Sequence, residues 1–183
     1  TGENHADLSE DYSAVPAEMK RVAAYLNGTV LRECDEQRFY REIPELRKKA
    51  GDRAVLRAFH FFNENRRVQK QTEALYDNDL KHFLKLVQES GDSSHKWLQN
   101  IYTCDTIHQQ GVTLGLALTQ QFLDKKGEGA VRVHGGGFAG TIQLLLPVVD
   151  VDSYKRIIEP VFGNNCVTSL TIRSQGATFC QFD

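Results

Sequence analysis

The first fifteen residues are polar and are expected to be the tail of a strand followed by a loop, and from Val15 as far as Gly127 apolar residues recur with helical spacing. The pattern predicts a helix that opens at Pro16, a region split into two short helices at Pro44, and four further helices. The ranges expected to be helical are 16–28, 34–51, 52–76, 77–91, 93–102 and 105–127. Three of them carry a stripe expected to face a core: Val15, Met19, Val22, Ala23 and Leu26; Leu56, Phe59, Phe62 or Asn63, Val68 and Leu75; and Leu80, Phe83, Leu84 and Val87.

The period of the pattern changes to two after this helical block. Residues 130–134 alternate apolar and polar side chains, 141–149 are apolar and strand-like, and 166–174 are rich in β-branched residues. These segments predict three strands, with a helix over 151–163 between the last two. Helices gathered apart from a short, mainly antiparallel sheet define the α+β class. No repeat or linker interrupts the chain, so residues 1–183 are expected to form a single domain.

Composition and charge narrow the class of protein. The chain is 40% hydrophobic and 25% charged, the balance of a folded domain, and its net charge of −2 gives no general attraction to nucleic acid or anionic membranes. No stretch reaches the ~18 apolar residues that a membrane span requires. We therefore expect no nucleic-acid or membrane partner and a cytoplasmic location. The basic clusters at 47–49 and 125–126 are interpreted as solvated helix ends.

The cysteines and the methionine carry further information. No two of the four cysteines form a CxxC pair, so we expect free thiols and no metal site. The only methionine is Met19, so the chain does not begin at a start codon and is expected to be processed or excised from a longer protein.

The candidate functional site is the glycine-rich stretch His134–Thr141, HGGGFAGT, between two expected strands. Its site residues are Gly135, Gly136, Gly137, Phe138, Ala139 and Gly140. A hairpin turn needs one or two residues at positive φ, and each extra glycine costs roughly 0.5–1 kcal/mol of folding entropy. Two interpretations remain: a tight turn, or a concavity of backbone N–H groups for a phosphate or substrate. A Walker A loop is excluded because no Lys-Ser/Thr follows, and a strand rather than a helix follows, unlike a dinucleotide fingerprint.

Several ordered motifs carry a resemblance to a known family. The loop resembles the third motif of the GHMP kinase superfamily and, more narrowly, the GGGFGG loop of galactokinases. Residues 5–23 resemble the segment that opens the galactokinase C-terminal half, and Arg-Ala-x-His at 57–60 and Glu-x-x-Arg at 64–67 follow in the family's order. A Ser/His-containing turn then precedes Leu98 and Tyr102. The resemblance covers nearly the whole chain.

The resemblance implies a ferredoxin-like GHMP kinase C-terminal domain whose parent phosphorylates galactose at its anomeric hydroxyl. ATP with Mg²⁺ would be bound mainly by an N-terminal half, the expected partner, which carries the phosphate loop and a catalytic aspartate. No Gly-Leu-Ser-Ser-Ser-type loop occurs in this sequence, so we expect an excised C-terminal domain that is inactive alone. No catalytic residue is assigned to it.

Supporting roles are weighed for five residues around the loop. His134 and Thr141 flank it, and His134 is expected to point away from the apolar face, as a phosphate or hydroxyl contact or as a solvent-facing residue. Asp92, Ser93 and Ser94 are expected to cap the next helix, with sugar or nucleotide contact as the alternative. Phe138 is expected to hold the loop's shape, against ordinary core filling. His60 and Glu64 are spaced to pair along a helix.

The sequence also departs from the galactokinase pattern. His134 stands where the family has Thr, Ala139-Gly140-Thr141 replaces Gly-Gly-Cys, and the Arg-Arg-x-x-Cys run after Tyr12 is absent. The sugar therefore stays open, and three rival hypotheses remain. They are a kinase for an uronic acid, pentose or N-acetylated hexosamine, a sugar and nucleotide sensor without turnover, and a free-standing interaction module.

Overall fold

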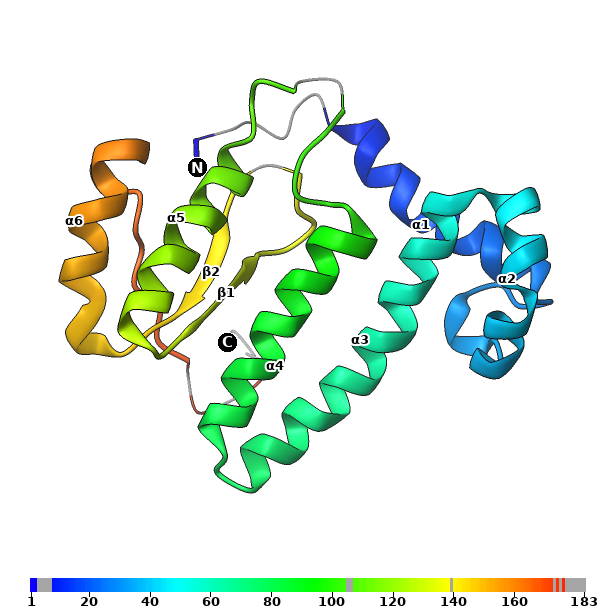
Figure 1. Ribbon diagram of the computed structural model, residues 1–183, viewed down its shortest axis with the longest axis horizontal. Helices are drawn as coiled ribbons and strands as arrows, with labels where there is room; N and C mark the ends of the chain where they lie inside the picture. Colours follow the sequence, from blue (N-terminus) through cyan, green and yellow to red (C-terminus); the bar gives the residue numbers. More distant parts are fainter. Residues whose placement is uncertain (3–7, 105–106, 139, 173, 175, 177–183) are drawn as a thin grey trace, which may run out of the picture.

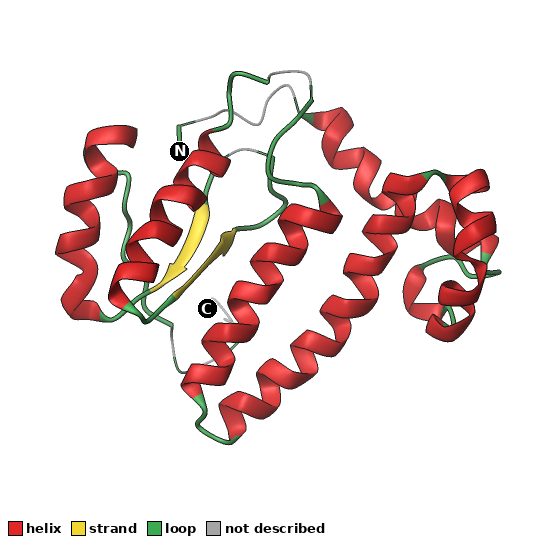
Figure 2. Ribbon diagram, in the orientation of Figure 1, coloured by secondary structure: helices red, strands yellow, loops and turns green. Residues whose placement is uncertain are grey.

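The structure is a computed structural model that describes residues 1–2, 8–104, 107–138, 140–172, 174 and 176. Helices dominate it, and one short hairpin forms the sheet (Figure 2). The helices are α1 (Ser9–Tyr25), α2 (Glu36–Ala50), α3 (Asp52–Tyr76), α4 (Leu80–Ser93), α5 (Gly111–Lys126) and α6 (Val151–Phe162). The strands are β1 (Ala130–Val133) and β2 (Ile142–Leu145), and the short turns are η1 (Leu31–Glu33), η2 (Ser94–Leu98) and η3 (Val148–Asp150).

The elements lie in a row across the molecule, with α1 and α2 at one end, then α3, α4, the hairpin and α5, and α6 at the other end (Figure 1). Helices α1 and α2 pack against the first half of α3, and α4 folds back along α3. The other side of α4 lies against β1, α5 contacts both strands, and α6 packs on α5. The sheet is therefore held between α4 and α5, in agreement with the expected α+β class.

The apolar side chains gather in two main clusters, one at each end of this row. The first joins α1, α2 and α3, and Val22, Phe39 and Leu46 are fully buried in it. The second joins α5, α6 and the hairpin around Phe122 and Tyr154. Between them, α4 approaches β1 so closely that a Cβ at Gly91 would lie 2.8 Å from the Val131 carbonyl oxygen.

The hairpin brings the candidate loop to one end of the sheet. Strands β1 and β2 are antiparallel, with Ala130 opposite Leu145 and Val133 opposite Ile142. The His134 N–H donates to the Thr141 carbonyl oxygen at 3.1 Å, which closes the ladder. The glycine loop is thus the connection between two paired strands, as the change of period predicts.

Several helix boundaries confirm the sequence pattern. Helix α3 spans the predicted residues, and α5 ends at Gly127 in the left-handed conformation. The basic clusters lie in the last turns of α2 and α5, as interpreted.

Other boundaries correct it. Helix α1 begins at Ser9 and encloses Pro16, and α2 runs unbroken through Pro44. In α2, the buried residues Phe39 and Leu46 on the two sides of Pro44 hold the helix where local propensity would break it. In α1, the contacts of Tyr12 with the glycine loop before Pro16 and the burial of Val22 after it do the same. Helix α4 continues past Gly91, because this glycine lets the helix meet β1 rather than ending it.

The predicted third strand is absent from the described part of 166–174, where Leu170 and Ile172 are 86% and 90% exposed and no ladder forms. β-Branched residues favour a strand only where a partner strand is available. The core assignments of Val68, Leu75 and Leu80 are also wrong. These side chains are at least half exposed, because the α3–α4 hairpin projects beyond the sheet (Figure 1).

The predicted helix over 105–127 begins at Gly111, and residues 105 and 106 lie outside the described part. No helix in the described ranges is both long enough and apolar enough to cross a membrane.

A buried ion pair connects α1 to α3. The Arg57 guanidinium, 1% exposed, donates to Glu18 Oε2 at 2.8 Å and through Nε to the Leu98 carbonyl oxygen at 3.1 Å. Arg53 donates to both Glu18 oxygens from the solvent side. Burial lowers the pKa of Arg57, and the Glu18 carboxylate opposes this. The pair therefore supplies the buried cation with its counter-charge.

Glu18→Ala is expected to destabilise the fold by about 3–5 kcal/mol, because it leaves the Arg57 cation buried without its counter-charge. Glu45→Ala, which removes an exposed pair with Lys48, is the control, with an expected change below ~1 kcal/mol. Urea denaturation of the two variants measures the difference. Equal losses would contradict a special role for Glu18.

Candidate functional site

Most described residues of the glycine loop have positive φ. Gly135, Gly137, Phe138 and Gly140 have φ of 67°, 85°, 61° and 88°, whereas Gly136 lies outside the positive range. Ala139, also predicted as a site residue, falls outside the described residues. Backbone of this kind favours glycine, which adopts positive φ without a steric cost.

Two of the glycines are required because other parts of this chain approach them. A Cβ at Gly137 would lie 2.0 Å from the Asn100 carbonyl oxygen, and one at Gly136 would lie 2.4 Å from Cε1 of Tyr12. Around Gly135, in contrast, nothing lies within 4 Å of the Cβ position. The loop is therefore more than a tight turn: its inner side is packed and its Gly135 side is open.

Side chains from distant segments hold the loop carbonyls inward. The Tyr12 hydroxyl donates to the Gly137 carbonyl oxygen at 2.7 Å, and Asn100 Nδ2 donates to that of Gly136 at 3.0 Å. Burial raises the pKa of Tyr12, so the phenol remains a donor at neutral pH. Within the described residues, the amides of Gly135, Gly136 and Gly137 donate no hydrogen bond.

Phe138 occupies the position expected of a loop anchor. Its side chain is 4% exposed and meets the Tyr12 ring edge-on, with ring centroids 5.4 Å apart. Its N–H donates to the Asn100 carbonyl oxygen at 2.5 Å. A bulky residue at φ 61° is strained, and these contacts on both its ring and its backbone hold it there.

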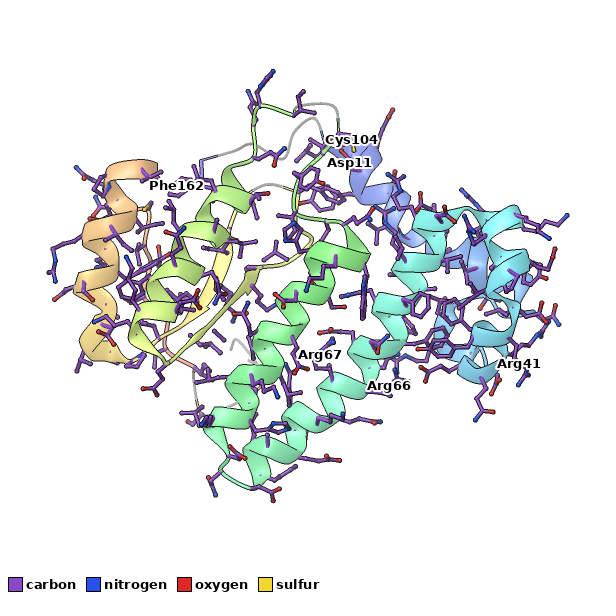
Figure 3. The ribbon with its side chains drawn as sticks, viewed as in Figure 1. Asp11, Arg41, Arg66, Arg67, Cys104 and Phe162 are labelled. Atoms are coloured by element: carbon purple, nitrogen blue, oxygen red, sulfur yellow. The ribbon has the colours of Figure 1, made fainter. Side chains whose placement is uncertain are left out.

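The wall beside Phe138 is charged. Asp11, at the start of α1, and Cys104 lie side by side in Figure 3, and both line a cavity of about 50 Å³ with Arg53, Arg57 and Phe138. The arginine charges are opposed by Glu18 and Asp11, which both act on Arg57. Positive and negative groups thus balance in this wall.

His134 and Thr141, two of the predicted supporting residues, flank the loop. Both are exposed, and they are joined through their main chains at the end of the hairpin. His134 follows the alternation of β1, as expected.

Asp92, Ser93 and Ser94 do not cap a new helix, because α4 runs directly into the π-helical turn η2 and no side-chain cap bond forms. Asp92 is exposed, and its Oδ2 lies 3.7 Å from Nζ of Lys96. Ser94 is 1% exposed, and its carbonyl oxygen accepts the Gln99 N–H. The cap interpretation of these three residues was therefore wrong.

Ser93 belongs to a buried polar network between α3, α4 and β1. Its hydroxyl lies 2.9 Å from His60 Nδ1, so His60 bonds Ser93 rather than pairing with Glu64 as its spacing suggests. Glu64 contacts Arg67 and Ser90, and Arg132 of β1 donates to Ser90 at 2.7 Å. The network ties the strand that enters the loop to two helices.

Tyr12 and Asn100 are site residues that sequence reasoning missed. They lie 125 and 36 positions from the loop residues that they bond, so no local pattern connects them to it. An asparagine directly before the buried Ile101 is the one local signal, because a buried amide needs partners. Among the described residues, no cluster of three His, Cys, Asp or Glu side chains could hold a metal.

Comparison with known proteins places this geometry in a family. No family model matches the sequence. Galactokinase of Haemophilus influenzae (strain ATCC 51907) is 32% identical over 154 residues, which cover 84% of this chain and 38% of that protein. Galactokinase of Actinobacillus pleuropneumoniae is 29% identical over the same shares. The structure of Lactococcus lactis galactokinase complexed with galactose superimposes with a TM-score of 0.64 at 18% identity, covering 88% of this chain and 39% of that one.

The structural match shows that this α+β arrangement is a fold found in galactokinases. More narrowly, the chain is a galactokinase homologue and corresponds to the C-terminal part of these proteins. It spans less than two fifths of the length of the relatives cited here.

Gly137→Ala is expected to destabilise the protein more than Gly135→Ala, although both residues have positive φ. The left-handed conformation costs an alanine about 1–2 kcal/mol at either position. At 137 the added methyl also meets the Asn100 carbonyl oxygen, which adds about 1–3 kcal/mol. Thermal unfolding compares the two variants, and equal losses would contradict the packed inner side of the loop.

The buried His60 is expected to make stability depend on pH. Burial lowers its pKa, and Arg67 and Arg132 act in the same direction against Glu64. The unfolded chain therefore takes up a proton near pH 6.5 that the folded protein resists. Stability should fall below that pH, by at most ~1.4 kcal/mol per pH unit, and stay constant above it.

Urea midpoints at pH 7.5 and 5.5 test this for the wild type, His60→Gln and His82→Gln. The His60 variant should lose part of the pH dependence, whereas the variant of the exposed His82 should keep it. A pH dependence unchanged in both variants would rule out His60 as its source.

Proposed function

We propose that this chain is the C-terminal domain of an ATP-dependent sugar 1-kinase that phosphorylates galactose. The observation that carries the proposal is the glycine loop, with its carbonyls bonded inward and three amides unbonded within the described residues, in a galactokinase homologue. In the reaction, the anomeric hydroxyl loses its proton, its oxygen bonds to the γ-phosphorus of ATP, and ADP leaves.

The loop's role would be electrostatic. Phosphoryl transfer depends on positioning and on neutralising charge spread over the phosphoryl oxygens. Backbone N–H groups that are already oriented supply this without reorganisation during the reaction. The open space around Gly135 would admit the phosphoryl group, while Phe138 and Tyr12 keep the loop in shape.

The remaining parts of the site would come from the rest of the polypeptide. The loop amides suit phosphate oxygens, so ATP with Mg²⁺ fits the exposed side of the loop as a neighbouring ligand. The proton acceptor, the nucleotide loop and most sugar contacts are assigned to an N-terminal half, which is the proposed partner of this domain. We therefore expect the isolated chain to be inactive.

The first test measures galactose-dependent ADP release with MgATP by the longest natural polypeptide that contains this chain, beside the chain alone. The longer protein should turn over, and the chain alone should remain at background. A galactokinase of Haemophilus influenzae whose C-terminal part is replaced by this chain provides a second active form. Turnover with another sugar would change the substrate, and nucleotide binding without turnover would favour a sensor.

A matched pair of variants tests the loop itself. Asparagine and aspartate have the same shape and both tolerate positive φ, so Gly135→Asn and Gly135→Asp differ mainly by one negative charge. If the loop faces a phosphoryl group, the aspartate variant should have a kcat lower than that of the asparagine variant by roughly tenfold or more. Equal kcat values would contradict phosphoryl contact at this loop.

A further inference from the structure

Asn100 stands at a point where the chain is turned sharply toward the glycine loop. It follows η2 through Gln99, a non-glycine residue with φ 57°. Just before Gln99, the Leu98 carbonyl oxygen accepts a hydrogen bond from Nε of the buried Arg57. The position of Asn100 is therefore set from α3, independently of the hairpin.

Both the main chain and the side chain of Asn100 contact the loop. Its carbonyl oxygen accepts the Phe138 N–H at 2.5 Å, and its Nδ2 donates to the Gly136 carbonyl oxygen at 3.0 Å. The residue is 3% exposed, and its Oδ1 has no hydrogen-bond donor among the described residues. Leucine has nearly the same shape and would leave no such unpaired oxygen, so packing alone does not account for an amide here.

The geometry of a peptide unit turns this contact into an orientation of the loop. All the described peptide bonds are trans, and in a trans unit the C=O and the following N–H point in opposite directions. When Asn100 draws the Gly136 carbonyl inward, the Gly137 N–H must point away from Asn100. Tyr12 draws the next carbonyl to its own side, which leaves the Phe138 N–H directed at Asn100.

We propose that Asn100 is a positioning residue for phosphoryl transfer: its side-chain amide orients the Gly137 N–H toward the phosphoryl group. This inference rests on the proposed kinase function. Because the Gly137 N–H would act on charge that develops during transfer, loss of its orientation should lower kcat rather than raise KM.

The test compares Asn100→Leu with Asn63→Leu in the longest active polypeptide. Asn63 is a half-buried asparagine on α3 that donates to the Phe59 carbonyl oxygen and accepts from Arg66, away from the loop. Asn100→Leu should lower kcat about 10- to 100-fold with both KM values within about threefold. Asn63→Leu should leave kcat within about twofold. Should the leucine variant fail to fold, Asn100→Ala keeps the main-chain contact and carries the same expectation.

An unchanged kcat in a folded Asn100 variant would overturn the proposal, as would a rise in KM without loss of kcat. A measurement that needs no turnover distinguishes failure of the Asn100 proposal from failure of the proposed kinase function. Amide NMR signals of Gly136 and Gly137 should shift in Asn100→Leu and not in Asn63→Leu. If the wild type shows no sugar kinase activity but these signals shift, the function fails while the orienting contact stands. If they do not shift, the proposal for Asn100 fails.

Discussion

The buried contact between Arg57 and Glu18 is the interaction on which the candidate site depends. Glu18 lies on α1, the helix that also carries Tyr12, and Arg57 lies on α3 and holds the Leu98 carbonyl oxygen just before Asn100. The Arg57 guanidinium therefore helps to position both residues that bond the loop carbonyls, Tyr12 through α1 and Asn100 through Leu98. In a low-dielectric interior this pair has few alternative geometries, because each charge needs its partner.

A second set of contacts fixes the loop from the strand side. Arg132 of β1 bonds Ser90 on α4, and Ser93, three residues further along, bonds His60 on α3. Gly91 brings the α4 backbone against β1 at the same level. These contacts fix the end of β1 that leads into the loop relative to α3, and α3 also positions Asn100. The hairpin and the residues that support its loop are therefore all positioned by α3.

Such an arrangement suits a loop that acts through its backbone. A catalytic side chain can be oriented by its own rotamer. A backbone N–H is oriented with its whole peptide unit, so the groups that bond the carbonyl of that unit decide where the N–H points. Tyr12 and Asn100 do this for two successive carbonyls, and Phe138 contacts both residues, Tyr12 through its ring and Asn100 through its N–H. Close packing explains two of the three consecutive glycines, Gly136 and Gly137, whereas at Gly135 nothing lies within 4 Å of the Cβ position.

Local pattern was enough to find where most helices lie, though not all their ends, because 3.6-residue spacing acts within one segment. It gave the full span of α3, the end of α5 and the hairpin that carries the glycines. It failed at Pro16, Pro44 and Gly91, where burial against other elements outweighs the preference of the residue itself.

By itself, the sequence determined the α+β class, the resemblance to galactokinases and the place of the loop between two strands. Only the tertiary structure decided which residues surround that loop. Tyr12 and Asn100 reach it from far along the chain, and the direction of each loop amide depends on those partners. The described part of 166–174 shows that the converse also holds, since a strand-like sequence forms no strand there without a partner strand. Pairing between distant segments depends on packing, and no local periodicity records it.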